Sequence, residues 1–385
     1  MSSHSQNSVA PLKFWLIKVL QNQKKRLIIS LLLALLTAIS DMGLLALSGW
    51  LITATAITGL AITAGTAVLL DIYRPGGGIR FFALSRTVGR YFERLHSHDM
   101  VLRVIAGFRL TLFTGLMDLP VQQLRNTQDG EWLSRLTADL DNLDSLLLKL
   151  LLPPMVVLSS VLLLAVFISF FWFTLGVTFG IITLLLGSIY FSFFTRKTSQ
   201  ISSDYARQIN QARSQTIEHL QGQLELQAAH LQQADQARLV SSLSEIGKSQ
   251  LKLNRHIANA QLIVNICHGL LVIAVAIAAL FAYQNQLVSG PVAVMLFLAV
   301  FGLGELLLNL PGQLGLWGRT RYAAERLQPL AEHASSEKST LAEIERLSMM
   351  VADHPKVISS LDTAFAFELN PSECLLISGR SGSGK

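Results

Sequence analysis

Charged residues are scarce in this chain of 385 residues. Asp, Glu, Lys and Arg together make up 15% of it, whereas about 25% is usual for soluble proteins. Hydrophobic residues make up 51%, and the mean hydropathy is positive. This composition excludes an ordinary soluble protein and predicts a membrane protein.

Cysteine is nearly absent. Cys267 lies in an apolar run, and Cys374 lies near the glycine-rich end of the sequence. The two positions belong to different parts of the expected fold, so no disulfide framework is predicted. Residues 1–26 contain a short apolar stretch without a small-residue cleavage site. We therefore expect an amphipathic elbow helix on the membrane surface there, and not a cleaved signal peptide.

The net charge of +6 does not indicate a nucleic-acid partner. Lys and Arg flank the apolar runs and do not gather on one basic face. Such flanking charges are typical of topology signals in membrane proteins.

Long runs without charge predict most of the membrane spans. Residues 27–70 contain a single charged residue, Asp41, and predict one span. Two longer runs, residues 150–195 and 257–304, contain no Asp, Glu, Lys or Arg and predict two spans each. We expect the first of these runs to break near residues 170–176 and the second at residues 284–291. The final span is expected to continue towards Trp317.

The segment from Ile79 to Met117 is predicted to be a further span, although it contains several arginines. Arg86, Arg90 and Arg94 recur at every fourth residue and therefore share one face of a helix. Such a polar stripe is expected to face water or a ligand, because exposing it to lipid would be costly. We expect the turn before this span at Gly76–Gly78, since Gly and Pro together interrupt helices.

Six spans in three hairpins are thus predicted. The short connections lack Lys and Arg, whereas the long ones are rich in them, so the long loops and both termini are expected in the cytoplasm. The predicted organisation is an elbow helix, a six-span membrane domain, a polar linker and the start of a soluble nucleotide-binding domain, at residues 1–26, 27–329, 330–346 and 347–385.

The last seven residues read GRSGSGK and fit the phosphate-binding pattern GxxxxGK. Glycines let backbone N–H groups curl around phosphate oxygens while the lysine reaches the β and γ phosphates. An apolar run at residues 374–378 predicts the strand that should enter such a loop. For the motif alone, a flexible Ser/Gly-rich tail is the alternative. The residues expected to bind the phosphates of ATP are Gly379, Ser381, Gly382, Ser383, Gly384 and Lys385.

This order of elements resembles the exporter half-transporters of the ABC superfamily. Two segments resemble the CydC half of the heterodimeric CydDC family more closely than they resemble general exporters. They are residues 44–61, LLALSGWLITATAITGLA, and residues 85–99, SRTVGRYFERLHSHD. GEWLSRLTADLDNLDSL at residues 130–146 is similar to the same family. The resemblance covers nearly the whole chain.

The resemblance implies a mostly α-helical membrane protein. Its fold would be the six-helix transmembrane domain of a type I ABC exporter, followed by the start of an α/β P-loop nucleotide-binding domain. The implied activity is ATP-driven export of cysteine and glutathione across a bacterial inner membrane, in support of cytochrome bd assembly and periplasmic redox homeostasis.

The implied partners are a CydD-like half-transporter, membrane lipid and a small thiol substrate. The implied cofactors are ATP with Mg²⁺, whose protein ligand we expect beyond Lys385, and haem, which is associated with this family. The catalytic ATPase motifs are also expected beyond Lys385, so hydrolysis would need the full-length, dimerised protein. No other metal site is predicted.

The arginine stripe is the candidate substrate site. Arg86, Arg90 and Arg94 would bind a substrate carboxylate, because the guanidinium fork matches it in two hydrogen bonds. Alternatively, these arginines pair with Glu93 or Asp99, or with lipid head groups. For haem, His98 lies one helical turn after Arg94, so an imidazole would bind iron while the guanidinium holds a propionate.

Three further ionisable residues within the predicted spans are functional candidates by their position, with helix–helix hydrogen bonding as the alternative: Asp41, His268 and Glu305. Residues 130–143 and 219–226 occupy the positions of the coupling helices of exporters. Two other functions stay open: a transporter that exports haem or is regulated by it, and a non-transporting membrane assembly factor for cytochromes.

Overall fold

The computed structural model describes residues 10–66, 69–119, 132, 135–333, 347–351, 365–369 and 376. The chain divides into two units, Met1–Ala334 and Ser335–Lys385, and each is described by itself. The predicted phosphate-loop residues 379–385 lie outside the described residues.

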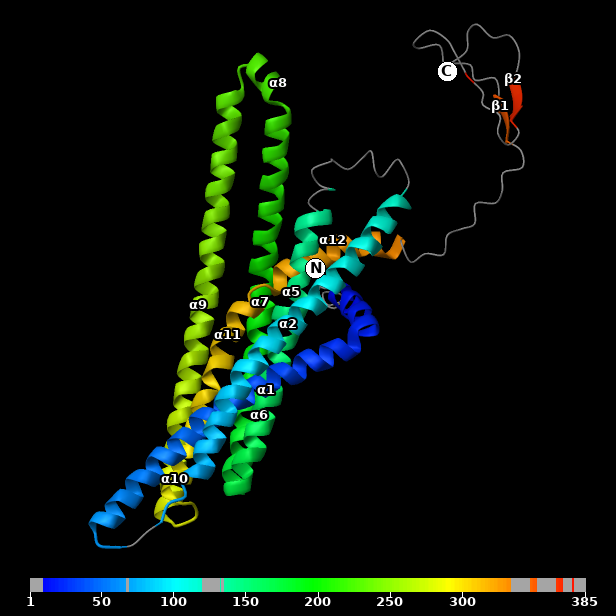
Figure 1. Ribbon diagram of the computed structural model, residues 1–385. Helices are drawn as coiled ribbons and strands as arrows, with labels where there is room; N and C mark the ends of the chain where they lie inside the picture. Colours follow the sequence, from blue (N-terminus) through cyan, green and yellow to red (C-terminus); the bar gives the residue numbers. More distant parts are fainter. Residues whose placement is uncertain are drawn as a thin grey trace. The chain divides into compact units, whose positions relative to one another are not determined.

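The first unit is helical (Figure 1). Short π-helical stretches, η1 and η2, flank α5 ahead of the third span. The helical elements in chain order are α1 (Ala10–Thr63), α2 (Tyr73–Met117), η1 (Arg135–Asp139), α5 (Leu140–Ser145), η2 (Leu146–Leu151), α6 (Leu152–Phe171), α7 (Phe173–Gln221), α8 (Gln223–Ala228), α9 (Gln232–Gln284), α10 (Gly290–Gly302), α11 (Gly304–Leu314) and α12 (Trp317–His333).

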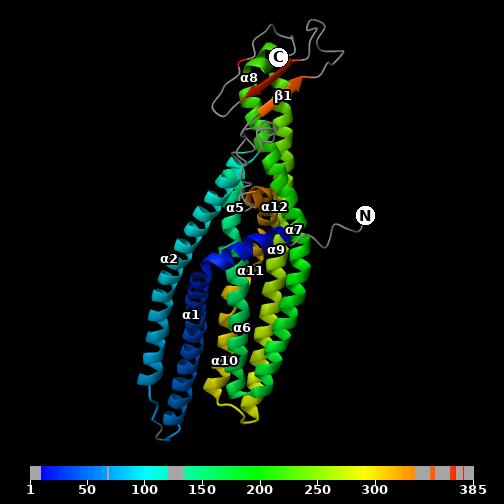
Figure 2. The same ribbon diagram turned by 90° about the vertical axis from the view of Figure 1, so that its right-hand side faces the viewer.

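Within the described residues, six helical stretches are long and apolar enough to span a membrane, as predicted. They form the hairpins α1–α2, α6–α7 and α9–α10, whose short connections lie at one end of the bundle (Figures 1 and 2). The breaks at Trp172 and at residues 285–289 fall where the sequence predicted them.

The prediction of a turn at Gly76–Gly78 is wrong. These glycines lie inside α2, and the chain reverses earlier, between Thr63 and Tyr73. Gly65 adopts a φ of 85° there, a conformation that other residues rarely adopt. Pro75 is tolerated because it lies in the first turn of α2, where a backbone N–H has no helical partner.

Two prolines explain the irregular start of the third span. Pro153 and Pro154 occupy the first turn of α6 and have no N–H to donate to the preceding carbonyl groups. The regular α-helical ladder is therefore interrupted at this point, and η2 ends directly before α6.

The first hairpin packs tightly through small residues. The Ser40 hydroxyl donates a hydrogen bond to the Ser85 hydroxyl across 3.0 Å. Gly89, one helical turn after Ser85, lies so near α1 that an added Cβ would come within 3.1 Å of the Thr37 hydroxyl oxygen. Small residues four apart let two membrane helices approach closely, and this approach fixes how α2 is rotated against α1.

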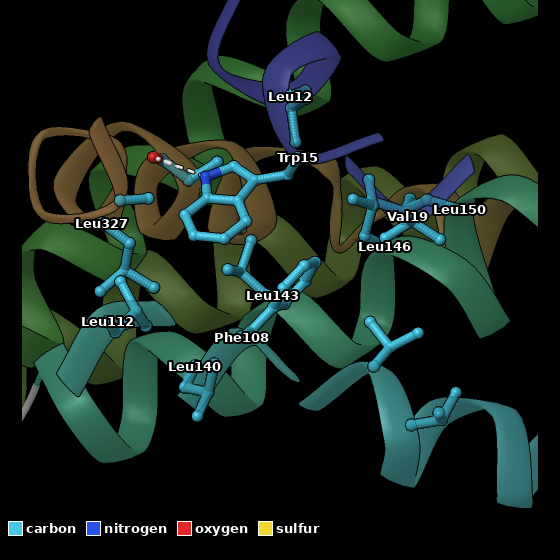
Figure 3. Close-up of a cluster of buried hydrophobic side chains, with 14 of the residues drawn as sticks. Leu12, Trp15, Val19, Phe108, Leu112, Leu140, Leu143, Leu146, Leu150 and Leu327 are labelled. Carbon is cyan, nitrogen blue, oxygen red and sulfur yellow. Dashed lines mark hydrogen bonds between the residues drawn. The ribbon is translucent and has the colours of Figure 1, made fainter. Parts of the chain in front are cut away.

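A buried cluster joins the N-terminal part of α1 to the rest of the membrane unit (Figure 3). A kink at Gln23 separates residues 10–22 from the remainder of α1. In this segment Trp15 is fully buried, and its indole N–H donates to the Ala324 carbonyl in α12 across 3.3 Å. Its ring also packs edge-on against Phe108 of α2, with 4.7 Å between ring centres.

The far end of the α7–α9 pair carries the short helix α8 (Figure 1). His219, in the last turn of α7, contacts Asp235, in the first turn of α9, with 2.5 Å between Nδ1 and Oδ2. This contact holds the ends of the two long helices together on either side of α8. The other predicted coupling segment, residues 130–143, lies partly outside the described residues.

The second unit contains a two-stranded antiparallel sheet. Strand β1 (Leu347–Val351) pairs with β2 (Phe365–Leu369), with Leu347 opposite Leu369 and Val351 opposite Phe365. Of the predicted strand at residues 374–378, only Leu376 is described, and the structure assigns it to no strand. In the first unit, α12 continues to His333, beyond the predicted start of the linker at residue 330.

Replacement of Trp15 by Ala is expected to destabilise the membrane unit. Removing a fully buried Trp side chain costs about 3–5 kcal/mol, so the thermal unfolding midpoint in detergent should fall clearly. Ile17→Ala is the matched control, because Ile17 lies on the same helical segment but is 51% exposed. Equal effects of the two substitutions would contradict the anchoring role of Trp15.

Oxidation should join Ser40→Cys to Ser85→Cys in a disulfide, because the two hydroxyl oxygens are 3.0 Å apart. Loss of maleimide-reactive thiols, measured by mass spectrometry in a chain without other cysteines, checks this. The control pair is Ile39→Cys with Ser85→Cys, since the Ile39 side chain is exposed. Failure of the first pair, or equal oxidation of the control pair, would refute the described pairing of α1 with α2.

Candidate ligand groove on the second span

A carboxylate inside the first hairpin pairs with two arginines of the predicted stripe. The Asp41 side chain, only 14% exposed, forms ion pairs with Arg86 and with Arg90, whose Nη2 donates across 3.0 Å. The close packing of α1 against α2 brings these groups together. Within a membrane span, pairing is essential because an isolated charge there is costly.

Arg90 also faces a second carboxylate. The Glu305 Oε1 atom lies 3.6 Å from Arg90 Nη2, and Glu305 is in the first turn of α11. Arg90 therefore connects α2 electrostatically with both α1 and α11.

Arg86, Arg90, Arg94 and His98 line one groove of about 590 Å³ on the surface of α2. A second row, one residue further along and with the same four-residue spacing, completes the lining with Thr87, Tyr91 and Leu95. All of these residues belong to α2, so the described part of the chain provides one wall of the groove.

Arg94 differs from the other two arginines. Its side chain is exposed, and no carboxylate of the described residues lies within ion-pair distance of it. Glu93 precedes Arg94 and attracts it electrostatically, while the Ser97 hydroxyl donates to the Arg94 backbone carbonyl across 3.2 Å. His98, one turn further, is also exposed.

The pairing that the sequence left open is thereby resolved for part of the stripe. Arg86 and Arg90 pair with Asp41 and not with Glu93 or Asp99. Asp99 instead accepts hydrogen bonds from Arg26 of α1, across 2.8 Å, and from Arg103, across 3.0 Å. The Asp99 cluster lies outside the groove lining.

Sequence reasoning missed Thr87, Tyr91 and Leu95 as lining residues. Their spacing of four parallels that of the arginines, so a search for the adjoining row of the same helix would have found them. The sequence identified Asp41 and Glu305 as ionisable groups within spans. It could not connect them with the arginines, because such contacts depend on how separate helices pack.

His268 takes part in helix packing and does not line the groove. Its side chain is 7% exposed, and Nε2 lies 3.1 Å from the Val300 carbonyl oxygen. At the break between α10 and α11 this carbonyl accepts a hydrogen bond from the Leu303 N–H across 3.1 Å, and the imidazole N–H is its second donor. An added Cβ at Gly304 would come within 2.7 Å of the imidazole ring, which explains the glycine.

The groove is suited to binding an anion that also has an apolar part. Guanidinium groups donate paired hydrogen bonds to carboxylates, while Tyr91 and Leu95 offer apolar surface beside them. The described residues contain no group of His, Cys, Asp and Glu that could hold a metal ion.

The family model for the ABC transporter transmembrane region matches residues 27–303. The chain is also 27% identical, over 95% of its length, to an Escherichia coli protein named glutathione/L-cysteine transport system ATP-binding/permease protein CydC. A Haemophilus influenzae protein of the same name is 27% identical over 96% of the chain. The chain spans 64% of the length of both relatives.

A second named subunit is also similar. The Bacillus subtilis glutathione/L-cysteine transport system ATP-binding/permease protein CydD is 27% identical over 45% of this chain, which covers 31% of that protein. The family match covers all six predicted spans except the end of the last one. With its three helical hairpins, the chain belongs to the ABC transporter family, of which it carries the transmembrane region.

Proposed function

We propose that this chain is the membrane part of an ATP-driven half-transporter that exports glutathione or cysteine. Two relatives that cover almost the whole chain are named as glutathione/L-cysteine transport proteins. The observation that carries the proposal is the groove on α2, where no carboxylate of the described residues lies within ion-pair distance of Arg94. Glutathione and cysteine both present the carboxylates that a guanidinium group binds.

The partner in this proposal is a CydD-like half-transporter. The described part of this chain lines the groove from α2 alone, so a second subunit has room to provide the opposite wall. The similarity to both CydC and CydD proteins supports a heterodimer.

ATP is proposed to bind at the phosphate loop, residues 379–385. Its backbone N–H groups and Lys385 would hold the phosphates, and Mg²⁺ would neutralise part of their charge. ATP bound between the nucleotide-binding domains of the two half-transporters would draw these domains together. Elements such as α8 would transmit this movement to the membrane spans. Hydrolysis would then reset the transporter.

The proposed location is a bacterial inner membrane, with both termini and α8 in the cytoplasm. The short connections of the hairpins lie at the opposite end of the bundle from α8 (Figure 1), and the long connections are rich in Lys and Arg. Export would therefore run from cytoplasm to periplasm, where thiols would support redox homeostasis and cytochrome bd assembly.

Haem is the second candidate ligand. Arg94 and His98 line the same groove one helical turn apart, and both side chains are exposed. These residues fit the group: the imidazole of His98 would bind the iron, and Arg94 would hold a propionate. Tyr91 and Leu95 provide apolar surface for a flat ring. Haem would be either cargo or a regulator of thiol export.

Inside-out membrane vesicles containing the full-length protein and its partner should take up labelled glutathione or cysteine when ATP is supplied. Lys385→Ala should abolish this uptake, because the phosphate clamp is lost. Arg94→Gln should reduce uptake about tenfold or more through loss of a charge-assisted hydrogen bond.

The matched control is Arg109→Gln, an exposed arginine of α2 outside the groove, which should retain near-normal uptake. Absence of ATP-dependent uptake by the unchanged, folded and ATP-binding protein would refute thiol export. It would favour haem transport or a non-transporting role in cytochrome assembly.

If haem binds the groove, the purified full-length complex titrated with haem should develop a Soret band that His98→Ala shifts or removes. His96→Ala is the control, because His96 lies on the same helix but outside the groove lining. An unchanged spectrum for His98→Ala would exclude His98 as the iron ligand.

A further inference from the structure

The charges around the groove are nearly balanced. Two of the three arginines of the stripe, Arg86 and Arg90, pair with Asp41, and Arg90 also faces Glu305. Asp41 is the more firmly held of the two carboxylates, because its side chain is 14% exposed and Glu305 is 57% exposed. Glu93 attracts Arg94 from outside the groove lining, so at most one positive charge, on Arg94, remains to attract a ligand.

The position of Asp41 is fixed by helix packing and not by the ligand. Ser40, the preceding residue, contacts Ser85 of α2 across 3.0 Å, and Asp41 faces Arg86, the residue after Ser85. The carboxylate is therefore held behind the groove lining, against Arg86 and Arg90, by contacts within the hairpin.

We infer that Asp41 sets the charge of the ligand that the groove accepts. Asp41 pairs with Arg86 and Arg90, and Glu305 supplies the second negative charge at Arg90. Asp41 thereby directs a single ligand carboxylate to Arg94 and disfavours ligands with more negative charge. Asp41 is thus a specificity-determining residue that acts through the arginines. This inference deepens the proposed function and rests on it for the choice of ligand.

The inference distinguishes among glutathione derivatives. Near neutral pH, carboxyl groups are ionised and amino groups are protonated. Reduced glutathione then carries one net negative charge, its monoethyl ester carries none, and oxidised glutathione carries two. The groove should prefer the singly charged form to the doubly charged one, although the two share the same peptide chemistry.

The first test is equilibrium binding of these three compounds to the full-length complex at about pH 7.5, where histidine is mostly neutral. Asp41→Asn should raise the affinity for oxidised relative to reduced glutathione on the order of fivefold, because one more positive charge then faces the ligand. Arg94→Gln should shift the preference towards the uncharged ester. The protein with both substitutions should again prefer reduced glutathione to the ester and to oxidised glutathione, because the two changes in charge cancel.

Asp99→Asn is the matched control. Asp99 also pairs with one arginine of α1 and with another of α2, namely Arg26 and Arg103, but it lies outside the groove. Its substitution removes an equivalent carboxylate from the same hairpin, and the ligand preference should stay unchanged.

A second test needs no substrate. Thr87→Cys places a thiol in the groove lining, in a chain whose other cysteines are replaced by serine. The rates at which this thiol reacts with anionic and with cationic methanethiosulfonate reagents report the electrostatic potential in the groove. Asp41→Asn should raise the anion-to-cation rate ratio on the order of fivefold, whereas Asp99→Asn should leave it unchanged.

The outcomes separate this inference from the proposed function. If the unchanged protein binds none of the glutathione compounds, thiol export fails as the function, while the thiol-modification ratios still decide the role of Asp41. If Asp41→Asn alters neither the modification ratio nor the ligand preference beyond the Asp99→Asn control, the inference is overturned.

Discussion

The ion pairs of Asp41 with Arg86 and Arg90 are the constraint on which the second span depends. A helix that carries arginines at membrane depth is stable only where those charges are paired or face water. Asp41 provides the pairing from the first span, and Glu305 adds to it from the last. The first hairpin and α11, which is distant from it in sequence, are thereby held in one arrangement around a polar face.

Packing of small residues makes this pairing specific. Ser40, Ser85 and Gly89 let α1 and α2 approach closely, and the approach sets the rotation of α2. The row of α2 that contains Ser85 and Gly89 then meets α1, while the two adjoining rows, which begin at Arg86 and Thr87, line the groove. At the other end of the hairpin, Trp15 ties α1 to α12, the last helix of the membrane unit. The same rigid contacts that stabilise the fold therefore also position Arg94 and His98.

Much of this architecture could be predicted because it depends on local patterns. Charge-free runs predicted the hairpins α6–α7 and α9–α10, and the four-residue spacing placed Arg86, Arg90, Arg94 and His98 on one face of α2. The predicted turn before α2 is misplaced, because Pro75 is tolerated in the first turn of this helix and the glycines after it continue the helix. The partners of Asp41 and His268 could not be predicted, since they lie on other helices. The roles of the phosphate-loop residues 379–385 remain predictions.

The central claim is that the α2 groove binds the transported anion. The most direct measurement is a cryo-electron microscopy structure of the full-length heterodimer with glutathione, in the absence of ATP. The account predicts ligand density in the groove, with a carboxylate against the Arg94 guanidinium and the Asp41 ion pairs intact. Ligand density elsewhere in the membrane domain, with an empty groove, would contradict it.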